Sequence, residues 1–391
     1  MNKPARHPIA FLLGIGALLV GLGGGLGFLA GRWLTSAPHS FPLLSEASAL
    51  VVTEYLGPLP DAANLERGAV RGWVQSLGDP YSLLVDPAGR ELETDTLTGE
   101  YGGIGADILR DSSGLVRLIP FVDGPAERGR IHEGDVLLAI DGVEVVADWS
   151  VEEITSRLRG PVGSAVRLTV DSSQDVEAPR SVELVRETFP LPTVSAYLYP
   201  DDVRIGVVRI SLFSAATPGE VDRGLDDLSS RGAAAFVLDL RGNPGGLLDS
   251  AVDTARLFLQ EGTVATEVRI GGSGPTFRVE SAGRWENWPL AVVVDGHTAS
   301  AAEVLAGALQ QHARGPLAGE PTLGKGTVQS IFILADGSSL HLTTAHWTLP
   351  DGEPLPAGGL VPELAVELNP ADPDASLRAA ADWLREQGLV R

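Results

Sequence analysis

Two residues whose types suit a nucleophile and its base stand 25 positions apart in the sequence. Ser300 follows an apolar run at 290–294 and a polar turn, at the point where a helix is expected to begin. Lys325 lies between two glycines, Gly324 and Gly326. A serine hydroxyl is a weak nucleophile, and a lysine amine can activate it once burial has lowered the amine's pKa. The pair therefore predicts acyl-transfer chemistry.

Lysine is rare in this chain. Of 29 Lys plus Arg residues, only Lys3 and Lys325 are lysines. A guanidinium stays protonated at any biological pH, whereas a desolvated amine can lose its proton. A lysine retained at position 325 among arginines favours a role as a base. The alternative is a surface lysine in a glycine turn.

Three other interpretations remain open for these residues. Thr298 or Ser300 could serve only as a helix N-cap. Residues 319–325 match a phosphate-binding loop, but Gly326 replaces the required Ser or Thr, and no clear strand precedes the loop. His297 could be the base of a different serine hydrolase, although the G-x-S-x-G motif is absent and no carboxylate can be assigned as its partner.

A glycine-containing loop at 239–246 lies between an expected strand and an expected helix. Its last two residues, Gly245 and Gly246, can present backbone N–H groups to a developing negative charge. Arg241 and Asn243 are expected to brace this loop. Gln329 follows Lys325 by four residues and could orient the amine by hydrogen bonding.

Composition limits the possible partners. The chain has 391 residues, 44% apolar and 20% charged, which describes a globular protein of two or three domains. A net charge of -22 argues against nucleic acid and against an anionic membrane surface as partners. The absence of cysteine excludes disulfides, zinc–thiolate sites and cysteine nucleophiles. Seven scattered histidines give a metal site weak support, and no cofactor is expected.

The N-terminus carries Lys3, Arg6 and His7 before an uncharged run of 24 residues, 8–31. This run is long enough to span a bilayer, and the positive flank predicts that the rest of the chain lies outside the cytoplasm. Residues 1–37 are therefore expected to be a single-pass membrane anchor that holds the catalytic part on the periplasmic or cell-envelope side. A cleaved signal peptide, cut near residues 35–37, is the alternative.

The remaining elements fall into three regions. Residues 38–100 contain helices at 45–77, with Asp61 or Asn64 as N-cap, and then a turn and a short acidic segment. Residues 101–187 contain short strands and a helix at 151–159. Their first turn is rich in glycine and could hold a peptide carboxylate while the peptide adds to a sheet edge, or it could be only a tight turn. Residues 188–391 alternate strands and helices, which predicts a partly parallel sheet.

The expected strands lie at 104–109, 116–119, 135–140, 166–170, 182–186, 205–210, 234–240, 264–270, 277–280, 291–294, 330–333 and 340–344. The expected helices of the last region lie at 218–229, 246–259, 300–311 and 377–387.

Taken in order, six segments resemble the carboxyl-terminal processing proteases, tail-specific serine endopeptidases that use a Ser-Lys dyad and carry a PDZ domain. The segments are Leu77-Gly-Asp-Pro-Tyr-Ser82, Gly102-Gly-Ile-Gly-Ala106, Gly134-Asp-Val-Leu137, Asp239-Leu-Arg-Gly-Asn-Pro-Gly-Gly-Leu247, Thr298-Ala-Ser-Ala-Ala-Glu303 and Gly324-Lys-Gly-Thr-Val-Gln329. The resemblance covers about residues 45 to 365. Gly242 and Leu323 depart from the more usual asparagine and phenylalanine, but neither change removes a functional group.

The resemblance implies a role for each matching residue. Ser300 would be the nucleophile, Lys325 the general base and Gln329 the residue that positions it. The oxyanion hole would come from the backbone N–H groups of Ala301 and of Gly245 or Gly246. The loop that receives the substrate's C-terminus would consist of Gly102, Gly103, Ile104, Gly105 and Ala106.

These observations predict a multidomain α/β protein. It would comprise a membrane helix (1–37), a small helical segment (38–100), a PDZ domain with two helices (101–187) and an α/β protease core with a mixed sheet (188–391). Its partners would be protein substrates with apolar C-terminal tails, and the membrane through the N-terminal helix. A homodimer is expected by analogy, because residues 45–77 resemble a subunit-pairing segment. The principal alternative is a non-catalytic PDZ adaptor.

Overall fold

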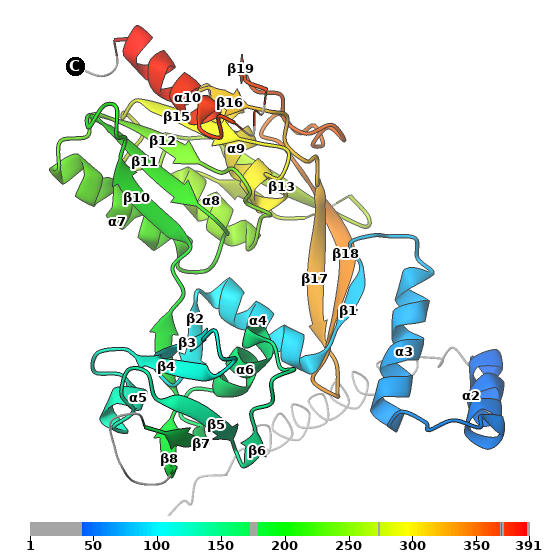
Figure 1. Cartoon of the computed structure of the whole chain (residues 1–391). Coiled ribbons are helices and arrows are strands. Elements are labelled where there is room, and N and C mark those ends of the chain that lie inside the picture. The colour runs from blue at the N-terminus through cyan, green and yellow to red at the C-terminus, as the bar shows by residue number, and fades with distance from the viewer. Residues whose placement is uncertain (1–40, 173–178, 273, 368, 370, 389–391) are drawn as a thin grey trace, which may run out of the picture. The chain divides into compact units, whose positions relative to one another are not determined.

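The computed structural model describes residues 41–172, 179–272, 274–367, 369 and 371–388 (Figure 1). The expected membrane segment, residues 1–37, lies outside this part of the chain. No helix within the described ranges is long and apolar enough to cross a bilayer. Contacts between backbone positions divide the chain into two units, residues 1–65 and 66–391.

Two helices open the described chain, α2 (Pro42–Glu54) and α3 (Ala62–Gln75). Proline at the first position suits α2, because the missing N–H has no partner within a helix there. Of the two expected N-caps of α3, Asp61 takes that place: its carboxylate accepts the backbone N–H of Asn64 at 2.7 Å.

The acidic segment before residue 100, for which no helix or strand was predicted, forms strand β1 (Leu83–Val85) and then helix α4 (Pro87–Thr98). The helix ends at Gly99, whose φ of 77° favours glycine. The helix was missed because its polar and acidic residues form no apolar stripe of helical period.

A β-rich region follows (Figure 1). Its main sheet has the strand order β3-β4-β5-β7-β8, so β3 lies at the end of that path. Two helices, α5 (Pro125–Arg128) and α6 (Val151–Leu158), accompany this sheet. The strands are β3 (Ala106–Arg110), β4 (Val116–Pro120), β5 (Val136–Ile140), β7 (Ala165–Asp171) and β8 (Arg180–Val185), with β6 (Val143–Glu144) beside β5 and a separate pair of β2 (Glu100–Gly103) and β9 (Glu187–Pro190).

The remaining chain is built on a six-stranded sheet of order β10-β11-β12-β15-β16-β19. β10 (Val194–Leu198) is antiparallel to β11 (Ile205–Ile210), and all later pairs are parallel, so the sheet is mixed as expected. The other strands are β12 (Ala235–Asp239), β15 (Leu290–Val294), β16 (Leu317–Gly319) and β19 (Leu364–Ala365). The helices are α7 (Thr217–Ser230), α8 (Leu248–Arg256), α9 (Ala301–Gln311) and α10 (Ala375–Glu386).

Helices cover both faces of this sheet (Figure 1). Side chains alternate along each strand, and both sets are apolar, because both faces are buried. Val208, Phe236 and Val292 pack into one cluster with α7, α8 and α9. Ile205 and Val237 pack into another cluster with α10. The strands therefore read as continuous apolar runs in the sequence.

Parallel strands bring three loops to one edge of the sheet. β12, β15 and β16 end at Asp239, Val294 and Gly319, and each strand is followed by one of the segments singled out from the sequence. Because these strands are hydrogen-bonded neighbours, their carboxyl ends lie together. This topology brings Ser300 and Lys325 to the same edge.

A second sheet completes the surroundings of that edge. It has the order β1-β18-β13-β14, with β17 also paired to β18. Its strands after β1 are β13 (Thr263–Arg269), β14 (Thr276–Arg278), β17 (Thr327–Ile333) and β18 (Ser339–Thr348). β1 is antiparallel to β18, with Leu84 opposite Leu340. The pairing places the segment before β1 beside the sheet that contains β17, the strand that follows Lys325.

Candidate active site

Ser300 lies in a strained turn between β15 and α9. Its φ of 55° and ψ of -118° fall in a region that non-glycine residues rarely adopt, at a cost of about 1–3 kcal/mol. The glycine-flanked hydrolase motif is absent, but the strand-turn-helix course and the strained serine are similar to a nucleophile elbow. Gly245 leaves room for the Ser300 side chain, because a Cβ at position 245 would lie 2.8 Å from the serine Cβ.

Glu303 ties the serine turn to the lysine loop. Its side chain is fully buried, and its two oxygens accept four hydrogen bonds. The donors are the backbone N–H of Ser300 at 2.9 Å, the Thr322 hydroxyl at 2.5 Å, and the N–H groups of Gly324 at 2.7 Å and Lys325 at 2.9 Å. In the sequence Glu303 stood out only as part of a motif, with no role assigned to it.

Lys325 is half-buried beside an aromatic ring. Its Nζ lies 4.7 Å from the ring centroid of Tyr81, and it has no ion-pair partner within 4 Å in the described part of the chain. Burial lowers the pKa of Lys325 below its ordinary value, and the charges of Asp79 and Glu303 oppose that shift. The indole N–H of Trp347 donates to the Lys325 carbonyl oxygen at 3.3 Å and so helps to hold the loop.

The phosphate-loop interpretation finds little support in this geometry. A short strand, β16, does end at Gly319, contrary to the expectation that no strand precedes the loop. After the loop, however, the chain enters β17 at Thr327 and not a helix. A phosphate loop relies on the N–H groups of a helix N-terminus, which Lys325 does not precede.

Ser300 and Lys325 line the same cavity, of about 360 Å³. Gly246, Ala301 and Gln329 line it too. The amide of Gln329 donates to the hydroxyls of Thr327 and Thr343 at 3.0 and 3.1 Å, so these bonds run within the sheet and not to the lysine. The cavity therefore gathers most of the residues expected at the reacting centre.

The two glycines of the 239–246 loop differ in what their N–H groups do. Gly245 donates to the Asn243 side-chain oxygen at 2.9 Å, so its N–H is already engaged. Within the described residues, the N–H groups of Gly246 and Ala301 donate no hydrogen bond. Gly246 has a φ of 126°, and a Cβ there would lie 2.2 Å from the Phe213 carbonyl oxygen, so only glycine fits. The pair of free donors is thus Gly246 and Ala301.

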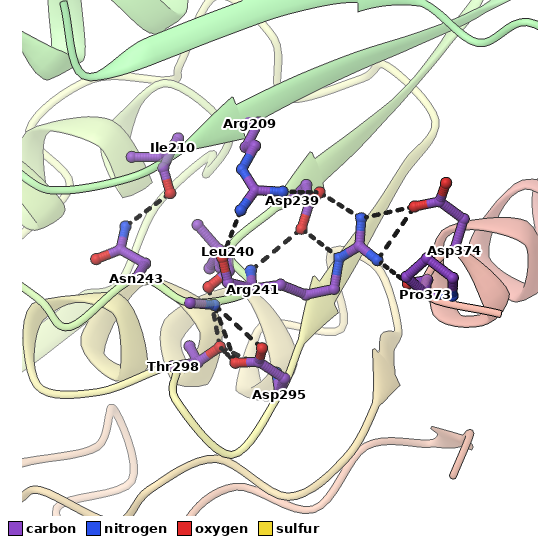
Figure 2. Close-up of polar contacts among 11 residues, drawn as sticks. Arg209, Ile210, Asp239, Leu240, Arg241, Asn243, Asp295, Thr298, Pro373 and Asp374 are labelled. Atoms are coloured by element: carbon purple, nitrogen blue, oxygen red, sulfur yellow. Dashed lines mark hydrogen bonds and ion pairs between the residues drawn. The ribbon is translucent and has the colours of Figure 1, made fainter. Parts of the chain in front are cut away.

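Arg241 and Asn243 brace this loop, as expected (Figure 2). The Arg241 guanidinium donates to both oxygens of buried Asp239, at 2.9 and 2.7 Å, and contacts Asp374 before α10. These carboxylates raise the pKa of Arg241 above its usual range. The Asn243 amide donates to the Ile210 carbonyl oxygen at 2.9 Å. The loop is therefore fixed to the sheet and to the C-terminal helix.

Asp295 connects the same loop to the serine turn (Figure 2). Its carboxylate accepts the N–H of Gly242 at 3.0 Å, the N–H of His297 at 3.0 Å and the hydroxyl of Thr298 at 3.1 Å. His297 itself is exposed, and the structure gives its ring no carboxylate partner within the described residues. Asp295 was not singled out, although a carboxylate directly after a buried apolar strand is a usable signal.

The glycine-rich turn of the β-rich region approaches neighbouring backbone closely. A Cβ at Gly102 would lie 2.1 Å from the Gly160 carbonyl oxygen, and Gly105 has a φ of 69°. Gly103, Ile104 and Ala106 line a cavity of about 220 Å³ between β3 and α6. The turn thus opens onto the free edge of β3, where an added strand would find unpaired backbone groups.

A larger cavity, of about 760 Å³, adjoins this turn. Gly102 and Tyr101 line it together with Arg90 of α4 and Arg159 after α6. The Arg159 guanidinium lies 4.2 Å from the Tyr101 ring centroid. The Nε atoms of Arg90 and Arg159 are buried without a hydrogen-bond partner among the described residues. No group of three or more His, Asp or Glu side chains in the described ranges could hold a metal ion.

Comparison with known proteins gives two family matches. Residues 204–366 match the model of peptidase family S41, and residues 122–171 match that of a PDZ domain. The chain is 33% identical to the carboxy-terminal processing protease CtpA of Bacillus subtilis over 353 residues, 90% of this chain and 74% of the relative. It is 37% identical to a carboxyl-terminal-processing protease of Synechocystis sp. over 305 residues, 76% and 70% of the two chains.

A solved structure also matches. The photosystem II D1 C-terminal processing protease has 28% sequence identity to this chain and a TM-score of 0.47, with 82% of this chain and 86% of that chain covered.

Proposed function

The chain belongs to the carboxyl-terminal processing proteases of peptidase family S41, and we propose that this serine-type peptidase cleaves proteins through a dyad of Ser300 and Lys325 after its PDZ domain has bound their C-terminal tails. The observation that carries the proposal is the shared cavity. It joins the serine hydroxyl, a half-buried amine and two free N–H groups, those of Gly246 and Ala301.

In the acylation step, Ser300 Oγ attacks the carbonyl carbon of the scissile peptide bond while its proton passes to neutral Lys325 Nζ. Burial supports this role, because it lowers the pKa of the amine and so raises the neutral fraction. The oxyanion of the tetrahedral intermediate is stabilised by the N–H groups of Ala301 and Gly246. Collapse breaks the C–N bond, the new amine takes the proton from Lys325, and an ester on Ser300 remains.

In the deacylation step, Lys325 Nζ accepts a proton from water, whose oxygen attacks the ester carbonyl. Collapse releases the carboxylic acid, and the proton returns from the amine to Ser300 Oγ. We assign Gln329 to the placement of the base through its position in the same cavity. Its bonds to Thr327 and Thr343 fix it in the sheet from which it faces the cavity.

Substrate capture is assigned to the turn at residues 102–106. The free edge of β3 supports strand addition by an extended tail, and the small cavity beside Ile104 supports an apolar terminal side chain. The substrates proposed are therefore proteins with apolar C-termini.

One cleavage assay tests the proposal. An unfolded protein with an apolar C-terminal tail is incubated with the wild-type chain and with Ser300→Ala, Lys325→Arg and His297→Ala. We expect the first two variants to lose cleavage and His297→Ala to retain it, since His297 is exposed and lacks an orienting carboxylate. Full cleavage by Lys325→Arg would refute the dyad. Loss of cleavage in Ser300→Ala and His297→Ala, with cleavage retained in Lys325→Arg, would favour a histidine base. Tail binding without cleavage by any chain would favour the adaptor.

We further propose that the uncharged run at residues 8–31 anchors the chain in a membrane, with the catalytic part outside the cytoplasm. Two arginines introduced into the run should release the protein from the membrane fraction.

We also propose, by analogy, that residues 45–77 pair two copies of the chain. Sedimentation of the protein with and without these residues tests that pairing.

A further inference from the structure

Tyr81 reaches the base from a distant part of the chain. It lies in the segment before β1, ahead of the β-rich region, yet its ring centroid is 4.7 Å from Lys325 Nζ. Tyr81 lines the cavity of about 360 Å³ that contains Ser300, and also a second cavity of about 470 Å³ that contains His297. Lys325 lines both as well, so the ring and the amine form a shared wall.

A series of hydrogen bonds holds this ring in place. The Asp79 carboxylate accepts the Tyr81 N–H at 3.0 Å and the Ser82 hydroxyl at 2.5 Å. The Ser82 hydroxyl in turn accepts the N–H of Thr343 in β18 at 3.1 Å. The backbone of Tyr81 is therefore tied to the sheet that carries the strand following Lys325.

The charged groups around the amine do not form an ion pair with it. The carboxylates that influence Lys325 are Asp79 and Glu303, and neither lies within 4 Å of Nζ. Across the shared cavity, Glu93 pairs with His341, and His297 lines the second cavity. Among the described residues, the face of Tyr81 is thus the direct electrostatic contact of the amine.

We propose that the ring of Tyr81 stabilises the ammonium form of Lys325 that appears when Ser300 loses its proton, and so acts as a positioning residue for the base. The inference rests on the proposed dyad. The negative face of an aromatic ring attracts an ammonium ion but not a neutral amine. The contact is therefore stronger in the transition state of acylation than in the resting enzyme, which is the condition for raising the rate.

The ring also has a second effect, which acts on the protonation of Lys325 in the opposite direction. Its bulk keeps water from the amine, which favours the neutral form that accepts the proton. Three substitutions separate the two effects. Tyr81→Phe keeps the bulk and the face, Tyr81→Leu keeps apolar bulk without the face, and Tyr81→Ala removes both and admits water.

The titration of Lys325 can be measured without activity, because the chain has only two lysines. The full-length protein is labelled with lysine that carries 13C at Cε, and the Lys325 NMR signal is assigned by its absence in Lys325→Met. Tyr81→Phe should titrate as wild type. Tyr81→Leu should titrate at lower pH, by about 0.4–1.5 pKa units. Tyr81→Ala should titrate at higher pH, because burial is the largest cause of the depressed value.

The cleavage kinetics of the same variants give a second measurement of the effect of the ring. On the alkaline plateau, kcat of Tyr81→Leu should fall about two- to thirty-fold, and that of Tyr81→Phe should stay within about twofold. Phe332→Leu, an exposed aromatic on β17, is the matched control and should leave both measurements unchanged. Equal unfolding midpoints for the Phe and Leu variants of Tyr81 show that folding is intact.

The inference is overturned if Tyr81→Leu titrates and reacts as Tyr81→Phe does, or if the Leu and Ala variants shift the titration in the same direction. A failure of the dyad itself looks different: Lys325→Arg would then retain cleavage, and the wild-type Lys325 signal would titrate near the ordinary lysine value of 10.5.

Discussion

Glu303→Gln tests how far one buried carboxylate holds the reacting groups together. Each carboxylate oxygen accepts two hydrogen bonds, one oxygen those of Thr322 and Gly324 and the other those of Ser300 and Lys325. Glutamine has the same shape, but one oxygen becomes an NH2 donor. The less costly orientation turns the NH2 towards Thr322, because a hydroxyl can also accept.

In that orientation the partly buried Gly324 N–H has no acceptor, and the Thr322 hydroxyl proton loses its bond to the carboxylate. An unsatisfied donor costs about 1–3 kcal/mol and a lost hydrogen bond to a charged group about 1.5–3 kcal/mol, so we expect about 2.5–6 kcal/mol of destabilisation. At about 2–4 °C per kcal/mol for a region of this size, Tm should fall by at least about 5 °C. Calorimetry of the full chain measures this shift.

We expect kcat of Glu303→Gln to fall by more than the loss of folded protein alone would explain. The lysine loop and the serine turn share Glu303, and a displacement of about 1 Å between reacting groups can cost on the order of 100-fold in rate. Glu261→Gln, an exposed residue of the same region, is the matched control and should change neither Tm nor kcat. A Glu303→Gln protein with wild-type Tm and wild-type kcat would refute this account of the site.

Further predictions concern the dyad and its glycine loop. Because burial lowers the pKa of Lys325, the acid limb of kcat/KM should lie below pH 10.5, and activity should fall as the amine protonates. The unfolded chain holds that proton more tightly, so stability should rise with pH between the folded pKa and 10.5, a slope that Lys325→Met removes. Ser300→Gly should abolish cleavage and raise Tm, since glycine accepts a φ of 55° without strain, whereas Ser300→Ala should leave the strain in place. Gly246→Ala should lower both Tm and kcat, because its Cβ would lie 2.2 Å from the Phe213 carbonyl oxygen; unchanged unfolding and cleavage would contradict that close approach.

Much of the fold followed from the sequence because buried parallel strands are long apolar runs. β12 and β15 have no exposed residue, and their positions were expected to within two residues. α4 was missed because its residues carry no such pattern. β16 and β19 were missed because strands of three and two residues are too short to show a period.

At the site, Lys325 stood out because lysine is rare in this chain, and Ser300 stood out because it follows an apolar run at the expected start of a helix. The groups that hold them lay within the quoted segments, but no role could be assigned to them. Glu303 bonds backbone N–H groups, which leave no mark on the sequence, and Tyr81 meets Lys325 only through the pairing of β1 with β18. Which of the two glycines keeps a free N–H depended on the rotamer of Asn243, which no spacing reveals.

The pairing of β1 with β18 also has a consequence for biosynthesis. Ser82 and Thr343 are bonded across 261 positions of the chain, so a nascent polypeptide carries Tyr81 out of the ribosome long before its partner strand exists. The serine and the lysine both emerge before β18 does. A growing chain therefore contains the proposed nucleophile and base before the ring can be fixed beside the amine. We expect cleavage activity to appear only after β18 has emerged and paired with β1.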